Sequence, residues 1–279
     1  MSFQTPVEAL AHIFAADAEQ KRRWYSPAAE AYNAVRPKYP EDVIAFAVDT
    51  AELKATSRIL EIGCGPGTAT TAFASRGLSI VAVEPNPDFF AIARRNCELY
   101  PSARFLNSTF EEFPVEAASF DCVIAATSMH WVSADTAYTK AAEALIARGR
   151  LILLWNMVLQ PSDEANRRFA PIYQSRAPQL IRPETDSAAT QDFHLRRSGE
   201  IALESCAFHD LQSIVRVVPI TYSSDDYLRL LTTYSQYIAL DPAIRDGLFA
   251  DIRRIIDNEL GGRLALTYRS ACQVMRKRL

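Results

Sequence analysis

Short apolar runs alternate with helix-like segments through the middle of the chain. The runs expected to be strands are residues 58–62, 79–84, 104–106, 120–125 and 150–155. Their apolar character is continuous instead of alternating, which is typical of strands covered by other elements on both faces. Strands that alternate with helices over short connections predict a parallel α/β sheet with right-handed crossovers.

Residues at the expected helix ends support this alternation. Asn86 and Pro87 supply a cap and a first-turn proline for a helix that runs to about residue 99. Ser133 begins a further helix, and we expect it to end at residues 148–149, where an arginine precedes a glycine.

The N-terminal flank departs from the pattern of the middle region. Residues 7–24 have the periodicity of an amphipathic helix. Pro37 and Pro40 then interrupt regular structure, and a helix is expected from Pro40 to about residue 49. We expect this flank to act as a lid.

The C-terminal flank, after about residue 156, combines helix, loop and strand patterns. Prolines interrupt helix and loop signals between about residues 161 and 199. Strand patterns return at 214–220 and at 264–275, and we expect the latter to be an edge strand. Two helices are expected between these strands, near residues 225–234 and 242–260.

These elements predict one domain over residues 1–279, built on a doubly wound, seven-stranded, mostly parallel α/β sheet. The expected parts are a helical lid (1–50), a ligand-binding core (58–156), an insertion (157–210) and C-terminal strands and helices (211–279).

Composition narrows the function class. The chain has 279 residues, 49% of them hydrophobic, which is enough for one large core. The net charge is −3 and no basic stripe is visible, so we expect no nucleic-acid partner. No apolar run approaches the roughly 20 residues that span a bilayer, and no signal-peptide pattern is seen. We therefore expect no membrane contact and a cytoplasmic location.

The five cysteines give no sign of a metal site. They are scattered, and none forms a C-x-x-C pair: Cys64, Cys97, Cys122, Cys206 and Cys272. Reduced thiols and no bound metal are the expectation.

The most informative segment is residues 60–68, between the first strand and its helix. Its glycines have the spacing G-x-G-x-G, and Thr68 stands where a dinucleotide fingerprint would have its third glycine. Glu61, two residues before the first glycine, would repel a pyrophosphate. It would instead accept a hydrogen bond from a cationic ammonium group, directly or through water. S-adenosylmethionine (SAM) carries such an ammonium group and no phosphate.

Glu84 ends the second predicted strand. Its carboxylate suits a bidentate grip on ribose hydroxyls at the carboxyl edge of a doubly wound sheet. That role fits both NAD and SAM, so Glu84 by itself does not discriminate between them.

Residues 60–68 resemble motif I of the class I SAM-dependent methyltransferases. Residues 83–86 look like the ribose-binding acidic loop of that family, and residues 108–111 are similar to its adenine-binding loop. The family places a polar side chain, here Thr109, at the adenine amino group, and the next backbone N–H, that of Phe110, at a ring nitrogen. Many relatives have Asp or Ser in place of Thr109. The resemblance implies SAM as cofactor, with these cofactor contacts: Arg36, Glu61, Gly63, Cys64, Gly65, Gly67, Glu84, Pro85, Thr109, Phe110 and Thr127.

A subgroup of this family adds a second resemblance. The His130–Trp131 pair after the fourth strand, Trp155–Asn156 after the fifth, and the tyrosine- and proline-rich stretch at residues 32–40 recur in it. The subgroup includes enzymes similar to trans-aconitate methyltransferase, which esterify small carboxylic acids. The resemblance covers residues 24–156 closely and the C-terminal part more loosely.

Several residues are candidates for the acceptor side of the site. His130 is either a general base or a packed histidine. The expected substrate pocket consists of Tyr25, Tyr32, His130, Trp131, Trp155 and Asn156, and core packing is the alternative for its aromatic members. Arg36 is expected to bind the carboxylate of SAM or an acidic substrate, with a solvated arginine as the alternative.

The expected function is methyl transfer from SAM to a small molecule, with a carboxylate oxygen as one acceptor. A carboxylate needs no base because it is already ionised near neutral pH, whereas a hydroxyl would need His130. A non-catalytic SAM-binding protein remains an alternative. An NAD-dependent oxidoreductase is less favoured, because the third glycine is missing. The oligomeric state does not follow from the sequence.

Overall fold

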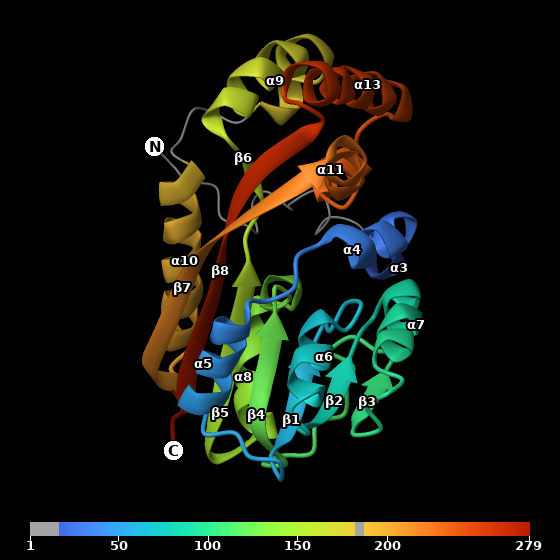
Figure 1. Ribbon diagram of the computed structural model, residues 1–279. Helices are drawn as coiled ribbons and strands as arrows, with labels where there is room; N and C mark the ends of the chain where they lie inside the picture. Colours follow the sequence, from blue (N-terminus) through green and yellow to red (C-terminus); the bar gives the residue numbers. More distant parts are fainter. Residues whose placement is uncertain (1–16, 182–186) are drawn as a thin grey trace.

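The computed structural model describes residues 17–181 and 187–279. The described residues form a central sheet with helices on both faces and a helical cap beyond one edge (Figure 1). The strands are β1 (Arg58–Ile62), β2 (Ser79–Val83), β3 (Ala103–Leu106), β4 (Phe120–Ala126), β5 (Leu145–Asn156), β6 (Gln160–Pro161), β7 (Phe208–Ser223) and β8 (Arg263–Lys277).

The strand order is β3-β2-β1-β4-β5-β8-β6, with β7 paired to β8. Strands β1 to β5 pair in parallel, whereas β8 runs antiparallel to β5, β6 and β7. The order reverses between β1 and β4, which creates the crevice where doubly wound sheets bind ligands. The predicted doubly wound, mostly parallel sheet is thus confirmed.

Two details of the sheet differ from the expectation. The described sheet has eight strands instead of seven, because the two-residue β6 also pairs with β8. The prediction of an edge strand at residues 264–275 was wrong, since β8 lies between β5 and β7. Only the first half of β8 alternates between exposed and buried positions, and residues 270–275 are continuously buried.

The described α-helices are α3 (Ala18–Arg23), α4 (Ala29–Val35), α5 (Glu41–Thr50), α6 (Thr68–Ala74), α7 (Pro87–Asn96), α8 (Ala134–Ala144), α9 (Asp163–Arg176), α10 (Ser187–Glu204), α11 (Ser224–Leu231), α12 (Ser235–Ile238) and α13 (Pro242–Glu259). Short 3₁₀ turns are η1 (Ser26–Ala28), η2 (Met129–Trp131) and η3 (Pro178–Leu180). Residues 7–16 of the predicted first helix lie outside the described residues.

Helix boundaries follow local signals where a cap is present. The Asn86 side chain accepts hydrogen bonds from the backbone N–H groups of Asp88 and Phe89, as predicted for the start of α7. The prediction that α8 extends to Arg148–Gly149 was wrong. The strand begins already at Leu145, which is fully buried and pairs with Phe120 of β4.

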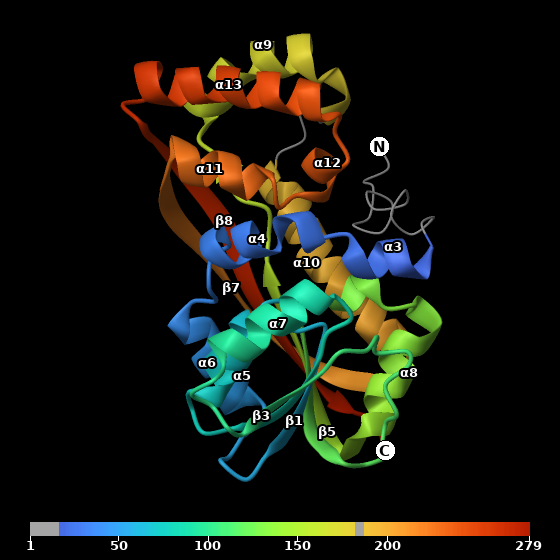
Figure 2. The same ribbon diagram turned by 90° about the vertical axis from the view of Figure 1, so that its right-hand side faces the viewer.

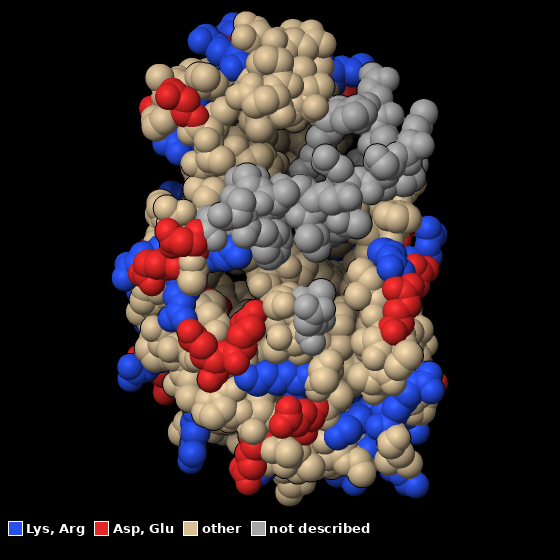
Figure 3. All heavy atoms as spheres, turned by 180° about the vertical axis from the view of Figure 1, so that it is seen from behind, with Lys and Arg blue, Asp and Glu red and all other residues tan. Residues whose placement is uncertain are grey.

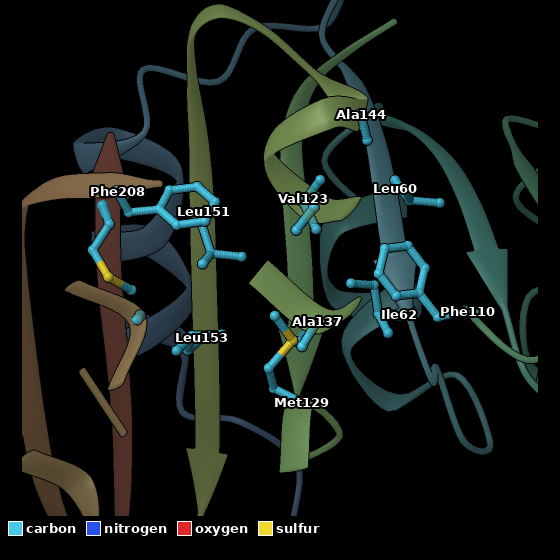
Figure 4. Close-up of a cluster of buried hydrophobic side chains, with 14 of the residues drawn as sticks. Leu60, Ile62, Phe110, Val123, Met129, Ala137, Ala144, Leu151, Leu153 and Phe208 are labelled. Carbon is cyan, nitrogen blue, oxygen red and sulfur yellow. The ribbon is translucent and has the colours of Figure 1, made fainter. Parts of the chain in front are cut away.

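Each sheet face has its own hydrophobic cluster. Side chains such as Leu60, Val123 and Leu153 point to the face covered by α8 and α10 (Figure 4). Ile59 and Ile124 point to the opposite face, against α5 and α6. Both faces are therefore covered, as the continuous apolar strands predicted.

A third cluster holds the cap together. Strands β7 and β8 extend past the carboxyl ends of β1, β4 and β5, and carry α9, α11 and α13 above them (Figures 1 and 2). Phe169, Leu230 and Ile256 are among the buried residues of this cap. The C-terminal helices therefore overhang the sheet edge, whereas α10 of the expected insertion packs along β7 and β8. The division into lid, core and insertion stays a prediction.

On the face seen from behind, basic and acidic side chains are interspersed (Figure 3). No helix within residues 17–181 and 187–279 has the length and apolar character needed to cross a membrane.

Candidate functional site

The glycine turn joins β1 to α6 at the carboxyl edge of the sheet. Gly63, Gly65 and Gly67 have φ angles of 62°, 54° and 83°, which favour glycine. A Cβ on Gly63 would lie 2.8 Å from the Cβ of Ser128, so the turn approaches the end of β4 closely. A Cβ on Gly65 would meet nothing within 4 Å. The middle of the turn is therefore open to a ligand at the main chain.

Glu84 ties this turn to the loop after β2. Its Oε2 accepts a hydrogen bond from the Gly65 N–H at 2.7 Å, and its Oε1 accepts one from the Asn86 N–H at 2.8 Å. Burial raises the pKa of Glu84 to about 7. Each oxygen keeps a second lone pair, so the predicted grip on ribose hydroxyls is compatible with these bonds and stays a prediction.

Glu61 has one oxygen without a partner. The residue is 1% exposed, and the Thr70 hydroxyl donates to its Oε2 at 2.6 Å. Its Oε1 is buried and accepts no hydrogen bond. Burial raises the pKa of Glu61 to about 8. Because buried carboxylate oxygens are normally satisfied, a ligand that brings a cationic donor fits this position.

The two candidates for adenine contacts, Thr109 and Phe110, differ in which polar groups are left without a partner in the protein. The Thr109 hydroxyl accepts a hydrogen bond from the Glu112 N–H at 3.2 Å, so it stabilises its own turn. The Phe110 side chain is 2% exposed and belongs to the core. Its backbone N–H makes no hydrogen bond to the described residues, and this is the group that the resemblance assigns to the adenine ring.

Cys64 and Pro85 act through the main chain. The Cys64 N–H donates to the Val83 carbonyl at 3.1 Å, and its carbonyl accepts from the Gly67 N–H at 3.0 Å. The Pro85 carbonyl accepts from the Asn107 side chain at 3.1 Å. Both residues shape the two loops, and direct ligand contacts of either stay a prediction.

The N-terminal segment is fastened to both cofactor loops. The Asn86 side-chain amide donates to the Arg22 carbonyl at 2.7 Å and to the Ser26 hydroxyl at 3.1 Å. Arg22 also forms an ion pair with Glu112 at 2.6 Å. Sequence reasoning missed this role of Asn86, because the cap signal explained its presence without any long-range partner.

The segment at residues 37–39 lies across the ends of β4 and β5. The Tyr39 and Thr127 hydroxyls are 3.0 Å apart, and the Asn156 side-chain amide donates to the Pro37 carbonyl at 2.9 Å. Thr127 has a φ of 55°, which is strained for a β-branched residue. Thr127 and Asn156 therefore hold this segment in place, and a cofactor contact of Thr127 stays a prediction.

Arg36 connects the N-terminal segment to the cap. Its Nε donates to the Thr233 hydroxyl at 2.8 Å, and its Nη2 donates to the Thr233 carbonyl at 2.9 Å. The guanidinium carbon lies 4.8 Å from the Tyr32 ring centre and 4.3 Å from that of Tyr234. Nη1 makes no hydrogen bond to the described residues. Arg36 is thus an oriented cation with one nitrogen left for a ligand.

Five of the six predicted pocket residues have rings that lie in a row, and the sixth, Asn156, lies apart from them. Ring centroids lie 5.7 Å apart for Trp155–His130 and for His130–Trp131, 5.6 Å for Trp131–Tyr25 and 5.9 Å for Tyr25–Tyr32. Asn156 does not join them. Successive residues of a strand point to opposite faces, so Asn156 lies on the other side of the sheet from Trp155.

Tyr25 makes a second bridge to the cap. Its hydroxyl lies 3.0 Å from that of Ser235, at the start of α12. Ser235 and Thr233, the partner of Arg36, were not among the predicted site residues. No local sequence signal marks either of them as a partner of residues so distant along the chain.

His130 follows β4 in η2, at the same edge. Its Nδ1 is buried and has no hydrogen-bond partner. Burial lowers the pKa of His130 to about 4 because it disfavours the charged imidazolium. The ring is therefore neutral near pH 7, and its nitrogen lone pair can accept a hydrogen bond, whereas full protonation of the buried ring is disfavoured.

Comparisons with known proteins agree with this geometry. Residues 59–149 match a family model described as a methyltransferase domain. An uncharacterized methyltransferase of Mycobacterium tuberculosis is 36% identical over 132 residues, which are 47% of this chain and 51% of that protein. An uncharacterized methyltransferase of Schizosaccharomyces pombe is 22% identical over 226 residues, 81% of this chain and 84% of that protein.

The chain spans about half the length of the first curated relatives that it matches. Among solved structures, a putative type II methyltransferase from Anaeromyxobacter dehalogenans superposes with a TM-score of 0.64 at 20% identity. The match covers 87% of this chain and 98% of that one, and it shows a shared fold.

Proposed function

We propose that the chain transfers a methyl group from SAM to a small-molecule acceptor, because residues 59–149 match a methyltransferase domain and the chain shares its fold with a putative methyltransferase. The observation that carries the proposal is the unpartnered Oε1 of Glu61, buried beside an open glycine turn. A cationic ammonium group would satisfy this oxygen and favour the ionised carboxylate, whereas a pyrophosphate would oppose that ionisation.

The residues present fit SAM at three points. Glu61 would accept from the ammonium group, Glu84 would take the ribose hydroxyls, and the Phe110 N–H would donate to the adenine ring. When bound, SAM supplies a methyl group already activated by a sulfonium leaving group. The chain's task is to hold the acceptor in line with that methyl group and to exclude water. The row of aromatic rings and the cap would do both.

We propose that the methyl acceptor is a carboxylic acid. It is supported by the resemblance to the trans-aconitate methyltransferase subgroup and by the free Nη1 of Arg36. A carboxylate that approaches a sulfonium neutralises charge as the transition state forms, and a site of low dielectric strengthens that attraction. The same proposal includes a location in the cytoplasm and an acceptor that is one of the small molecules dissolved there.

His130→Ala distinguishes the two oxygen acceptors. An ionised carboxylate needs no base, so His130→Ala should leave ester formation with only a modest loss. A hydroxyl must lose its proton, so the same change should lower its methylation by about two to four orders of magnitude if His130 is the base.

The direct test is incubation with isotope-labelled SAM and pools of organic acids, phenols and amines. We expect label in the acid pool and an ester product. Turnover with amines or phenols alone would disprove the carboxylate while sparing the methyltransferase proposal. SAM binding without transfer to any pool would favour a non-catalytic SAM-binding protein.

A further inference from the structure

Several buried side-chain atoms of the described residues have no hydrogen-bond partner, and three of them come from η2, β5 and α10. These three are Nδ1 of His130, Nε1 of Trp155 and Oε1 of Gln191. Trp155 is 9% exposed and Gln191 is 5% exposed, so neither side chain is satisfied by open solvent. Each unpartnered group carries a cost of about 1–3 kcal/mol unless something binds it.

The three residues lie on η2, β5 and α10, whose buried side chains Met129, Trp155 and Leu195 belong to one core cluster. Trp155 of β5 shares the core cluster of Leu195, which lies one helical turn after Gln191 on the same face of α10. The Gln191 amide donates to the Val158 carbonyl at 2.8 Å, just beyond the end of β5. The His130 and Trp155 rings are 5.7 Å apart and inclined by only 31°.

The chemistry of these atoms is uncharged and complementary. The indole N–H of Trp155 only donates, and the amide oxygen of Gln191 only accepts. Neutral His130 presents a second acceptor when its proton is on Nε2. The neighbouring Arg269 donates from Nε and Nη2 to the two carboxylate oxygens of Asp192, so the charges of this ion pair balance each other.

We propose that His130, Trp155 and Gln191 form a subsite for an uncharged hydroxyl group of the methyl acceptor. A hydroxyl oxygen accepts from Trp155 while its proton goes to Gln191 or His130. A carboxylate only accepts, so it would face the Gln191 oxygen with no compensating charge. The inference deepens the proposed function and rests on it: the acceptor carries a hydroxyl here, and any carboxylate it has binds elsewhere.

The test is an NMR titration that needs no turnover. The chain has three tryptophans, and Trp155→Phe identifies the indole N–H signal of Trp155. The full chain, saturated with S-adenosylhomocysteine, is titrated with phenol, benzene and benzoate. We expect phenol to shift the Trp155 indole signal saturably, at concentrations at least about tenfold lower than those at which benzene or benzoate shifts it, a difference of about 1.4 kcal/mol.

A matched variant separates recognition from folding. Gln191→Met keeps the length of the side chain and removes the acceptor, so it should weaken phenol binding several-fold and leave benzene binding unchanged. Thermal unfolding of the variant checks that the chain is intact. The proposal would be overturned if phenol and benzene shifted the Trp155 signal at equal concentrations, if benzoate shifted it at a lower concentration than phenol, or if phenol did not move it.

Failure of the proposed function would look different. If S-adenosylhomocysteine itself does not bind, the cofactor assignment falls. The phenol titration of the ligand-free chain would still report on the subsite.

Discussion

The two halves of the proposed site, a cofactor side and an acceptor side, are built in different ways. On the cofactor side, the bond between Gly65 and Glu84 joins residues only 19 positions apart. On the acceptor side, Arg36 reaches Thr233 across 197 positions, and Tyr25 reaches Ser235 across 210. The cofactor half is thus a local motif. The acceptor half forms where the N-terminal segment contacts the cap, far away along the chain.

The electrostatics of the two halves also differ. The cofactor side buries two carboxylates, Glu61 and Glu84, without a cation beside them, and the pKa of each is raised. The acceptor side holds its cation, Arg36, between two tyrosine rings, and its imidazole is neutral. The difference implies that the ammonium group of SAM, bound as proposed, would balance the charge of the cofactor half, whereas the cation of the acceptor half is already held by ring contacts.

The largest expected effect is at Glu84. Glu84→Ala removes the proposed ribose contacts and leaves the N–H groups of Gly65 and Asn86 unpaired. We expect SAM binding to weaken by about 2–4 kcal/mol, measured by calorimetry. The exposed Glu30 serves as control, and Glu30→Ala should leave the dissociation constant unchanged. An unchanged constant for Glu84→Ala would show that the ribose is held elsewhere.

Next is the glycine turn. Gly63→Ala combines a left-handed φ with a contact of 2.8 Å to the Ser128 Cβ, whereas Gly77→Ala has a φ of 79° and open space. Both changes should cost about 1–2 kcal/mol of stability for the backbone conformation. Gly63→Ala should cost about 1–3 kcal/mol more because of overpacking. Equal melting temperatures for the two variants would contradict the close approach of the turn to β4.

The pH dependence of SAM binding sharpens the electrostatic contrast. Glu61 must be ionised to face an ammonium group, and its pKa is raised from 4.5 to about 8. SAM affinity should therefore rise with pH up to about 8, by at most tenfold per unit from this group. The stability of the ligand-free protein should change in the opposite sense. The contribution of Glu61 is fully present below pH 4.5 and is lost as the pH rises through about 8.

Glu61→Gln is the matched control for this dependence. It should reduce the rise of SAM affinity between pH 7 and 8 to at most about twofold, because Glu84, with a pKa of about 7, is already half ionised at pH 7. An unchanged slope in this variant would assign the proton to another group.

The smallest effect is expected at the contact between the N-terminal segment and the cap. Thr233→Val removes the hydroxyl that accepts from the Arg36 Nε, at a cost of about 1 kcal/mol. The Michaelis constant for the acceptor should rise about fivefold, with that for SAM unchanged. Arg36→Ala should do the same if Arg36 anchors the acceptor. A raised constant for SAM in Arg36→Ala would instead assign Arg36 to the SAM carboxylate.

The same contrast explains what the sequence could predict. The sheet, the glycine turn and the acids at two strand ends are local patterns, and the fold class they predict is confirmed. The edge strand expected at residues 264–275 rested on an alternating pattern. Only the first half of β8 alternates between exposed and buried residues, so its position inside the sheet was missed. Thr233, Ser235 and Gln191 were missed because a single threonine, serine or glutamine gives no local signal, and tertiary packing alone brings them to the site.

The most direct test of the central claim is calorimetric titration of the chain with S-adenosylhomocysteine and, separately, with NAD. The account predicts saturable binding of S-adenosylhomocysteine at one site per chain, lost in Glu84→Ala, with NAD binding weak or absent. Tight binding of NAD, with no heat from S-adenosylhomocysteine, would contradict it.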